Sequence, residues 1–410
     1  MSNGDGFIDL NFNRKLPLDQ VAHVSDYANK IIKRKKVLAF SDREVEQEVI
    51  ETAVKAAGTS PSGANQQPWK FITVKDPLVK KKVRVAAEAD AKMNGAASTK
   101  AYLEEAPYLV VLFRENYSVK AKRNGEWKKV RHYYPFESTA ICAGFFLAAL
   151  ENSGLDSIIH SPFDELSSIL NRPKNETPTA VFAVGFAEKT NGTFNHSSGS
   201  ATKLVIGDID MGKKIADVST SLPDIDPLTL AKNYYAEIKR RRNIRDFSTE
   251  DVEEELIIRS LKAAISSPSA GNTQPYRFAV VKNIEVKKVI REQAENEEKK
   301  LYEERISTEW KEALAPLATN WMKPHLTDAP YLIIAFKVID KEQSGHSDVE
   351  VLGSYDKQHA LLATGMSVGV LIGALHFAGL ATLTYTPSPM AFLRDLLNRP
   401  KNEMPESFYQ

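Results

Sequence analysis

The chain has 410 residues, of which 42% are hydrophobic and 26% charged, and its formal net charge is +1 at pH 7. These values are typical of an ordinary globular protein with a substantial core, and the near-zero charge gives no global reason to expect nucleic acid or an anionic membrane as a partner. The single cysteine, Cys142, excludes an internal disulfide and any multi-cysteine metal site. Neither a signal peptide nor an apolar stretch long enough to span a bilayer is visible, so a cytoplasmic protein is expected.

The first part of the chain predicts an arm, a helix and an exposed turn. Residues 1–30 are polar and lead into a basic cluster. Ser41-Asp42-Arg43-Glu44 has the pattern of a capping box, which predicts a helix from there to about Gly58. Residues 59–69 are dense in Pro, Gly, Ser and Asn, and such a turn exposes backbone N–H groups that can lie flat against a planar ligand.

The same half continues with strands and a helix. Residues 71–74, 109–113 and 180–186 are rich in β-branched and aromatic side chains, which predicts strands. Residues 140–150 are apolar almost all round, which predicts a central helix buried on several sides.

Most of these features return in the second half, in the same order. The repeated elements are a basic cluster, a capping pattern, a polar turn, two strands and a buried helix, at residues 240–245, 248–251, 266–276, 278–281, 332–336 and 366–375. The sequence Leu-Asn-Arg-Pro-Lys-Asn-Glu also occurs twice, at residues 170–176 and 397–403. An ordered repeat of this length predicts two related units.

The repeat sets the expected domains. We expect an arm, a first unit, a linker and a second unit, at residues 1–30, 31–187, 188–225 and 226–410. Each unit mixes helices with an antiparallel or mixed sheet, so the fold class is α+β. The second unit stops soon after Glu403 and is expected to lack a counterpart of the strand at residues 180–186.

The second half contains an additional charged segment between its polar turn and its second strand. The segment runs from about residue 292 to residue 323, and its helical pattern places Glu298 and Tyr302 on one helix face. With Lys323 it provides a carboxylate, a phenol and an ammonium, which suit an amino-acid zwitterion. A charged surface helix without a ligand is the alternative interpretation.

The second basic cluster is suited to holding an anion. In an extended chain Arg241, Asn243 and Arg245 project to one side, so two guanidinium forks can bind a phosphate. The first cluster has Lys35 and Lys36, which lack the fork geometry. A solvated basic surface run is the alternative for such clusters.

The ordered set of motifs resembles the FMN-dependent nitroreductase superfamily. The set comprises the basic cluster with Phe-Ser, the Pro-Ser-Gly turn, Ala-Pro-Tyr-Leu, the Ala-rich helix, Thr-Pro and Asn-Arg-Pro. His132-Tyr133-Tyr134 and the segment Glu298…Tyr302…Asn320-Trp321-Met322-Lys323 look most like the iodotyrosine deiodinase branch. The resemblance implies a homodimeric family with two FMN sites at the subunit interface. This chain looks like both subunits fused, a tandem intramolecular pseudo-dimer that is expected to be monomeric.

The resemblance implies two composite sites, each built from both units. One would combine the second basic cluster and its Thr-Pro segment with the first turn, through Arg241, Arg242, Asn243, Arg245, Thr384, Thr386, Pro61, Ser62, Gly63, Ala64 and Asn65. The other would combine the first basic cluster with the second turn and the charged lid, through Lys35, Lys36, Ser161, Pro268, Ser269, Ala270, Glu298, Tyr302 and Lys323.

The resemblance also implies roles for these residues. Thr386 and Ser161 would be the catalytic hydroxyls, because a hydroxyl that donates to flavin N5 tunes one-electron against two-electron transfer. A hydroxyl that satisfies its own turn is the alternative. Ala64 and the three lid residues would bind the substrate, and the other members of the two sets would bind the cofactor.

The implied function is FMN-dependent reduction of a small aromatic substrate, with reductive dehalogenation of a halotyrosine or halophenol as the leading interpretation. A general nitroreductase or quinone reductase, a flavin-fragmenting enzyme, and a flavin-binding pseudoenzyme or sensor are the alternatives. The expected electron donor is NAD(P)H or a separate flavin reductase protein. No motif in the sequence identifies a nicotinamide site.

Overall fold

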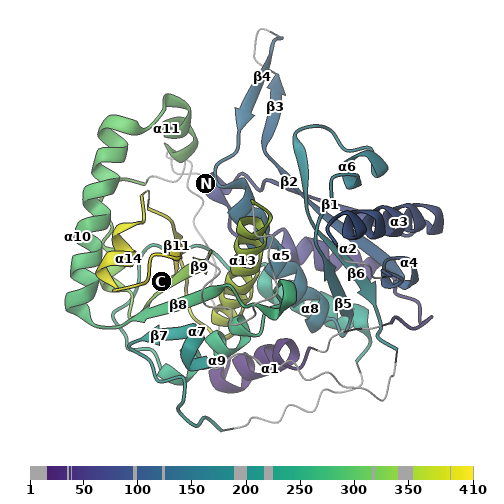
Figure 1. Cartoon of the computed structure of the whole chain (residues 1–410). Helices are drawn as coiled ribbons and strands as arrows, with labels where there is room; N and C mark the ends of the chain where they lie inside the picture. Colours follow the sequence, from purple (N-terminus) through teal and green to yellow (C-terminus); the bar gives the residue numbers. More distant parts are fainter. Residues whose placement is uncertain are drawn as a thin grey trace, which may run out of the picture.

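The computed structural model describes residues 16–34, 37, 39–95, 99–121, 125–188, 201–216, 225–315, 319–339, 354–387 and 389–409 (Figure 1). Within these ranges, two sheets lie on opposite sides of two long central helices, α5 (Pro135–Asn152) and α13 (Ser354–Phe377). Lys35 and Lys36, the cations of the first basic cluster, lie outside the described residues.

The first sheet belongs to the first half of the chain and is antiparallel throughout. Its order is β1-β2-β6-β5, formed by Trp69–Val74, Tyr108–Glu115, Glu176–Gly185 and Asp156–His160. In β2, Leu109 and Val111 pack in one core with Val83 of α3 (Pro77–Met93), while Val110 and Leu112 pack in the core that contains α5. Burial on both faces explains the unbroken apolar run that predicted this strand.

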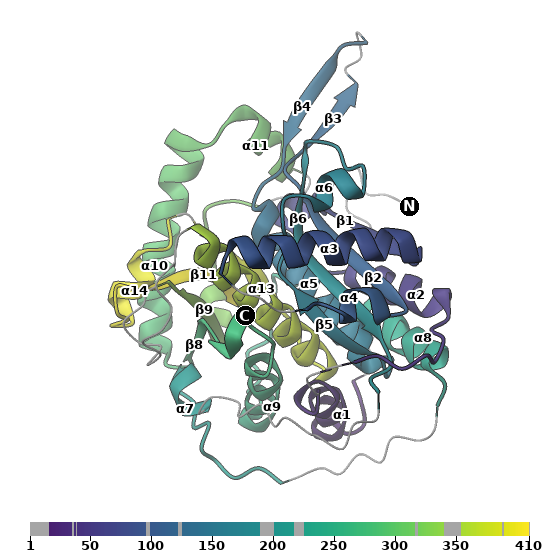
Figure 2. The ribbon, with the colours of Figure 1, turned by 45° about the vertical axis from the view of Figure 1, so that its right-hand side comes forward.

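Three smaller pieces complete the first unit. Helices α4 (Tyr102–Glu105) and α6 (Leu166–Ile169) lie near α3. Strands β3 (Tyr117–Ala121) and β4 (Trp127–Arg131) form a two-stranded hairpin that projects away from the body (Figure 2).

The second sheet repeats the strand order of the first. Its order is β10-β11-β9-β8-β7, formed by Thr384–Tyr385, Glu403–Tyr409, Leu332–Val338, Tyr276–Val281 and Val205–Gly207. Strand β11 pairs antiparallel with β9 as β6 pairs with β2, so the expectation that the second unit lacks its last strand is wrong. The strand escaped prediction because the register shifts between Pro405 and Ser407, which breaks the apolar alternation.

The linker contributes to the second sheet. Residues 188–225 were expected to be a plain connection, but they contain α7 (Ala201–Leu204) and β7, which pairs in parallel with β8. Gly207 has φ of 105°, and a Cβ there would overlap the Val280 carbonyl group, so this short strand depends on glycine.

Each unit is covered by a helix from the other half of the chain. Part of the expected arm is α1 (Gln20–Ile32), which packs on α9 (Glu254–Ile265) and α13 of the second unit. Helix α8 (Pro227–Ile238) packs on α2 (Gln47–Ala57) and α5 of the first unit. Tyr27 of α1 is fully buried and stacks on Phe377 with ring centroids 4.9 Å apart. The sequence did not predict this helix, because the many polar residues of its exposed face made the segment resemble an arm.

The two capping-box predictions place the helix starts too early. Helix α2 begins at Gln47 after Glu46, and α9 begins at Glu254 after Glu253, without a side-chain cap in either case. The segment Ser41-Asp42-Arg43-Glu44 contacts the sheet instead. The Ser41 N–H donates to the carbonyl oxygen of Phe186, the residue after β6, at 2.9 Å. The chain before α2 is thus fixed to the sheet rather than to the helix.

The additional charged segment is helical, as predicted. It forms α10 (Ile284–Lys300), a π-helical turn (Leu301–Arg305) and α11 (Thr308–Leu314). Helices α12 (His325–Asp328) and α14 (Phe392–Leu396) lie near α10 on the outer side of the second sheet.

The central helices are buried as predicted and approach closely through glycine. A Cβ on Gly144 of α5 would overlap the Met366 backbone, and a Cβ on Gly369 of α13 would overlap the Ile141 carbonyl oxygen. Residues Lys357–Phe377 of α13 are long and apolar enough to cross a membrane, which the sequence reading overlooked, but 94% of the window is buried inside the protein. These residues therefore form the central core.

Replacing Gly369 with alanine tests this close approach. Because the new methyl group meets backbone rather than a movable side chain, Gly369→Ala is expected to lower the free energy of unfolding by roughly 2–4 kcal/mol. Chemical denaturation measures the loss, and Gly58→Ala, whose methyl group meets nothing nearer than 3.4 Å, is the control. Equal stability of Gly369→Ala and the parent protein would contradict the close packing of α5 on α13.

Candidate functional site

A cavity of ≈ 730 Å³ lies at the seam between the two units. Its wall comes from the polar turn and α5 of the first unit, and from the second basic cluster, α13, β10 and the end of α10. All residues expected at the first composite site line it: Arg241, Arg242, Asn243, Arg245, Thr384, Thr386, Pro61, Ser62, Gly63, Ala64 and Asn65.

The polar turn has a backbone conformation that few residue types adopt. Ala64, Asn65 and Gln67 have φ of 47°, 52° and 49°, in the left-handed region. The Gln67 N–H donates to Ser62 Oγ at 2.9 Å, which closes the turn. The small and polar residues that marked this segment in the sequence are therefore those that its backbone requires.

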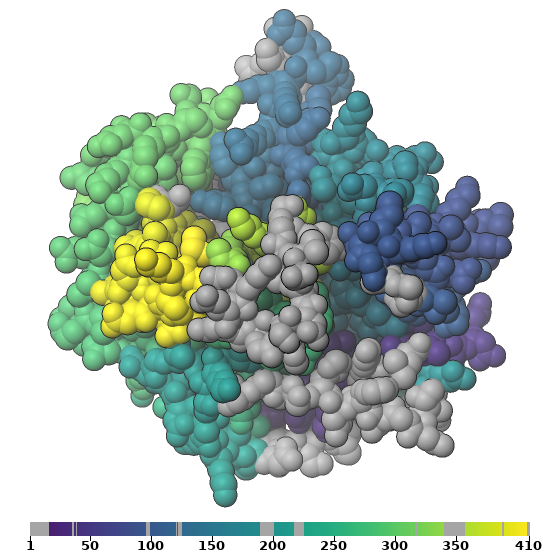
Figure 3. All heavy atoms as spheres, viewed as in Figure 1, coloured from purple at the N-terminus to yellow at the C-terminus, as the bar shows by residue number. Residues whose placement is uncertain are grey.

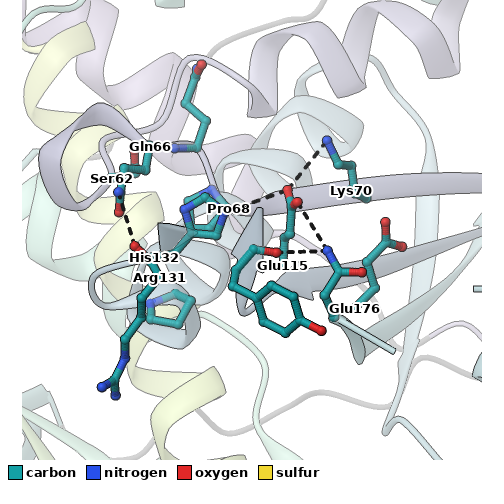
Figure 4. Close-up of polar contacts among 12 residues, drawn as sticks. Ser62, Gln66, Pro68, Lys70, Glu115, Arg131, His132 and Glu176 are labelled. Carbon is teal, nitrogen blue, oxygen red and sulfur yellow. Dashed lines mark hydrogen bonds and ion pairs between the residues drawn. The ribbon is translucent and has the colours of Figure 1, made fainter. Parts of the chain in front are cut away.

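Contacts to α5 and β4 fix the turn at the seam. The Gly63 N–H donates to Ser138 Oγ at 3.2 Å. Gln66 Nε2 donates to the Arg131 carbonyl oxygen at 3.4 Å, as Figure 4 shows. A Cβ on Gly63 would lie 2.5 Å from the Tyr133 carbonyl oxygen, so only glycine fits.

Arg241 is a buried cation that reaches across the seam. The residue is 8% exposed, its Nη2 donates to the Thr59 carbonyl oxygen at 3.1 Å, and its Nη1 donates to Asn243 Oδ1 at 3.0 Å. Its Nε has no hydrogen-bond partner within the part of the chain that the structure describes. Burial, followed by the charge of Arg242, lowers the pKa of Arg241 to about 10. A desolvated cation with an unused donor favours an anion in the cavity.

A backbone bridge places the basic cluster beside the Thr-Pro segment. Asn243 forms a parallel bridge with Thr382, and the Ile244 N–H donates to the Thr382 carbonyl oxygen at 3.0 Å. The cluster is therefore extended at this point, as expected. Because β10 follows Thr382, both Thr384 and Thr386 reach the same cavity.

The lid residues form a compact polar cluster over the cavity. Glu298 Oε2 lies 3.3 Å from Lys323 Nζ, and both residues are 6% exposed. The Tyr385 hydroxyl donates to Glu298 Oε1 at 3.2 Å, and the Tyr302 hydroxyl lies 2.9 Å from Thr319 Oγ1. The carboxylate, phenol and ammonium expected from the sequence are thus close together.

Burial sets the ionisation of this cluster. It lowers the pKa of Lys323, and the Glu298 carboxylate opposes that change. Burial also raises the pKa of Tyr302, and burial together with the Glu298 charge holds the pKa of Tyr385 well above its ordinary value. At neutral pH, Tyr385 is therefore a hydrogen-bond donor to Glu298 and not a phenolate.

The expected grouping of the lid is wrong. Glu298, Tyr302 and Lys323 were assigned to the site of Lys35, Lys36 and the second turn, but they line the cavity that contains Arg241. Helix α10 packs along its own sheet and against α14, so its end reaches β10 of the same unit. A sequence with two similar clefts does not say over which of them an insertion lies.

Apart from the lid, the described residues expected at the second composite site are not part of this cavity. Ser161, Pro268, Ser269 and Ala270 do not line it. The second turn nevertheless has the same construction as the first, because the Gln274 N–H donates to Ser269 Oγ at 2.8 Å.

At the matching described positions, the first unit lacks the lid carboxylate and phenol, while Lys100 stands in the place of Lys323. Helices α3 and α10 correspond, since Lys80 and Lys287 donate to the carbonyl oxygens of Ala106 and Ala329, each at 2.8 Å. In this correspondence, the places of Glu298 and Tyr302 are taken by Ala91 and Gly95. Matching Ser161-Pro162 with Thr386-Pro387 puts Ile159 in the place of Thr384.

An aromatic contact that the sequence reading missed joins the lid to the first unit. Trp310 of α11 stacks on Tyr133, with ring centroids 4.8 Å apart and an interplanar angle of 18°. Beside it, Lys128 Nζ of the hairpin lies 3.0 Å from Glu309 Oε1. Figure 3 shows the α10–α11 segment in green next to the base of the hairpin in blue. Tyr133 and Trp310 are far apart in the sequence, and only the fold pairs them.

Two carboxylates at the cavity wall were also missed. Glu137 lies in the first turn of α5 and Glu406 in β11, and both line the cavity. Burial raises the pKa of Glu406, and the neighbouring Lys337 opposes that change. Neither residue belongs to a recognisable motif.

The protein thus has an α+β fold of two related units with a cavity at the seam, and Arg241, Arg242 and Arg245 give part of its wall positive charge. The family model for the nitroreductase family matches residues 31–186 and 238–408. The chain belongs to the nitroreductase family and is an oxidoreductase of it. The predicted fold class is thereby confirmed.

Several proteins similar to this chain are iodotyrosine deiodinases. Iodotyrosine deiodinase of Haliscomenobacter hydrossis is 40% identical over 179 residues, which cover 43% of this chain and 78% of that protein. Iodotyrosine deiodinase of Hydra vulgaris is 37% identical over 179 residues, covering 42% of this chain and 62% of that protein. A crystal structure of oxidized iodotyrosine deiodinase bound to FMN and 3-iodo-L-tyrosine aligns with 42% of this chain and 95% of that chain, at 26% identity and a TM-score of 0.35.

Removal of the Trp310 ring tests how the lid is held. Helix α11 has seven residues, too few to be stable alone, so its order depends on contacts such as the stack on Tyr133. Trp310→Ala is expected to speed amide hydrogen exchange in α11 while leaving α13 unchanged. The control is Trp321→Ala, because Trp321 is 38% exposed. Unchanged exchange in α11 would show that other contacts hold the lid.

Proposed function

We propose that the protein is an FMN-dependent reductive dehalogenase that acts on a halotyrosine or halophenol. The observation that carries the proposal is the single cavity that brings together the buried Arg241, the left-handed polar turn, Thr386 and the Glu298–Lys323 pair. Similarity to iodotyrosine deiodinases supports the substrate class.

The residues of the cavity fit FMN. Arg241 offers an unused buried Nε–H, and Arg242 and Arg245 add positive charge, which suits the phosphate of FMN. The small residues of the polar turn, Ser62 to Asn65, line the cavity and leave room for a planar ring to lie close to their backbone. A volume of ≈ 730 Å³ is within the range of about 300–1,000 Å³ that is typical of small-molecule sites.

Bound FMN would supply the electrons, and the chain would supply position and protection from water. Replacing the halogen of a halophenol with hydrogen consumes two electrons and one proton and releases halide. Thr386 lines the cavity, and its hydroxyl would donate a hydrogen bond toward the cofactor, while Glu298 and Lys323 would orient a polar substrate. The lid limits access of water. NAD(P)H or a reductase protein would restore the electrons.

We also propose that the chain is a tandem pseudo-dimer, in which two units of one polypeptide take the places of the two subunits of a homodimer. Of its two clefts, one is active. The two matched segments, the common strand order and the exchanged helices α1 and α8 support the first part. Ala91, Gly95 and Ile159, which stand in the places of two lid residues and a hydroxyl in the first unit, support the second.

The cofactor assignment is tested with two neighbouring arginines. Arg241→Ala removes a buried charged donor and is expected to weaken FMN binding by about 10- to 100-fold, the loss of one or two charge-assisted hydrogen bonds. Arg240→Ala is the control, because Arg240 pairs with Glu237 at 3.1 Å and does not line the cavity. Quenching of FMN fluorescence gives the affinity, and the amount bound at saturation is expected to be one FMN per chain. Equal weakening by both substitutions would reject the phosphate site, and two FMN per chain would reject the single active cleft.

The reaction is tested with a chemical reductant. Under dithionite, the FMN-loaded protein is expected to release iodide from 3-iodotyrosine or 2-iodophenol, and Thr386→Ala is expected to slow that release by about 10- to 100-fold without loss of FMN. Thr327→Ala outside the cavity is the control. Reduction of nitroaromatics or quinones without iodide release would instead make the protein a general nitroreductase. FMN that binds but is never reoxidised would indicate a sensor.

A further inference from the structure

A groove of ≈ 470 Å³ lies in the second unit where α9 meets the start of α1 and the end of α13, in the lower part of Figure 1. This α9 groove is lined by the segment between the second basic cluster and α9, by the start of β9 and by the residues that follow α13. None of the residues that line it also lines the cavity at the seam. The α9 groove is therefore a separate site.

In the first unit, the chain itself fills the corresponding place. The Ser41 N–H donates to the Phe186 carbonyl oxygen at 2.9 Å, and the Glu188 N–H donates to the Ala39 carbonyl oxygen at 3.0 Å. The two segments form an antiparallel β-bridge, and the Phe186 ring packs against the main core. An extended segment with one large apolar side chain is thus the occupant of this place in the first unit.

The repeat puts the α9 groove at the same position in the second unit. A Cβ on Gly185, the residue before Phe186, would overlap the side chains of Pro107 and Phe40. The counterparts of these two residues in the Ala-Pro-Tyr-Leu and Phe-Ser motifs are Pro330 and Phe247, and both line the groove. Strand β11 corresponds to β6, but none of its residues lines the groove.

The second unit retains the backbone groups that hold the segment in the first unit. Ser248 and Asp246 are the counterparts of Ser41 and Ala39, and both line the groove. Within the part of the chain that the structure describes, neither the Ser248 N–H nor the Asp246 carbonyl oxygen pairs with another backbone group. One donor and one acceptor are therefore available to an added strand, at the spacing that the first unit uses.

The α9 groove is acidic. Among the described residues, four carboxylates and no Lys, Arg or His line it: Asp246, Glu250, Asp251 and Glu253. Asp251 is paired with Lys282 at 3.1 Å, and the other three form no ion pair with a described residue. The groove therefore favours a cation on its occupant.

The charge at one position is reversed between the two units. Arg43 stands in the first unit where Glu250 stands in the second, and its guanidinium carbon lies 3.8 Å from the centroid of the Phe186 ring. Alternate residues of an extended segment share a face, so Glu188 lies on the same face as Phe186. In the second unit, a basic residue two positions after the apolar one would project to the side of Glu250.

We propose that the α9 groove binds an extended segment of a partner protein, in which a large apolar residue is followed two positions later by lysine or arginine. The segment adds to Asp246–Ser248 as a short antiparallel strand, its apolar side chain enters the groove, and its cation meets the carboxylates of the rim. This proposal does not depend on the cofactor or the reaction of the cavity at the seam.

The test combines two peptides with a charge reversal in the full chain. The peptide Ala-Val-Gly-Phe-Ala-Lys-Ala has the required spacing, and a second peptide has glutamate in place of lysine, as the first unit has. Fluorescence anisotropy of the labelled peptides is expected to show about five- to ten-fold tighter binding of the lysine peptide, because one ion pair is exchanged for a repulsion. Glu250→Arg is expected to reverse this preference. No binding of the lysine peptide, or an unchanged preference in the variant, would overturn the proposal.

Controls separate the groove from general attraction between charges. Glu285→Arg changes an exposed glutamate of α10 that does not line the groove, and it is expected to leave the preference unchanged. A lysine peptide with alanine in place of phenylalanine is expected to bind at least about ten-fold more weakly. Equal binding of this peptide would show that charge alone acts and would contradict the proposal.

Two further measurements locate the peptide and identify the occupant. Binding of the lysine peptide is expected to slow amide hydrogen exchange at Ser248 and to leave the second polar turn unchanged. Slower exchange only at other places would reject the α9 groove as the site. Sedimentation is expected to show a monomer with and without peptide, and a dimer that the peptide dissociates would instead make a second copy of the chain the occupant.

Discussion

The close packing of α5 against α13 is the constraint on which the rest of the structure depends. Glycines at Gly144 and Gly369 let the two backbones touch, which brings the two sheets to a fixed separation. The polar turn of one unit and the basic cluster of the other then meet at the seam, where the Arg241 guanidinium reaches the Thr59 carbonyl oxygen. The cavity exists because two helices can approach this closely.

Much of the fold could be predicted from the sequence because its strands and central helices are locally encoded. Strand β2 is apolar on both faces, and α5 is apolar all round. Both patterns can be recognised in the sequence without knowledge of the tertiary structure. Strand β11 and helix α1 could not be predicted in this way. In β11, Pro405 and the adjacent bulge interrupt the strand pattern. In α1, the polar exposed face makes the segment resemble an unstructured arm.

The candidate site also has parts that the sequence predicts and parts that it does not. The turn around Gly63 and the cluster around Arg241 carry local signals, because a left-handed backbone and an extended basic run each demand particular residue types. Which cleft the lid covers, and that Trp310 would meet Tyr133, depend on chain paths separated by long stretches of sequence. The Tyr385–Glu298 contact is of this second kind.

Both walls of the cavity belong to one polypeptide, with residues near position 62 facing residues near position 242. The cost of bringing them together is the entropy of closing a loop, which does not change with protein concentration. A cleft between separate subunits would instead come apart on dilution according to mass action. This cavity is therefore independent of expression level, and a substitution in one unit alters one wall without altering its counterpart. The difference between the two units at the lid, where Ala91 and Gly95 stand in the places of Glu298 and Tyr302, is one that this independence permits.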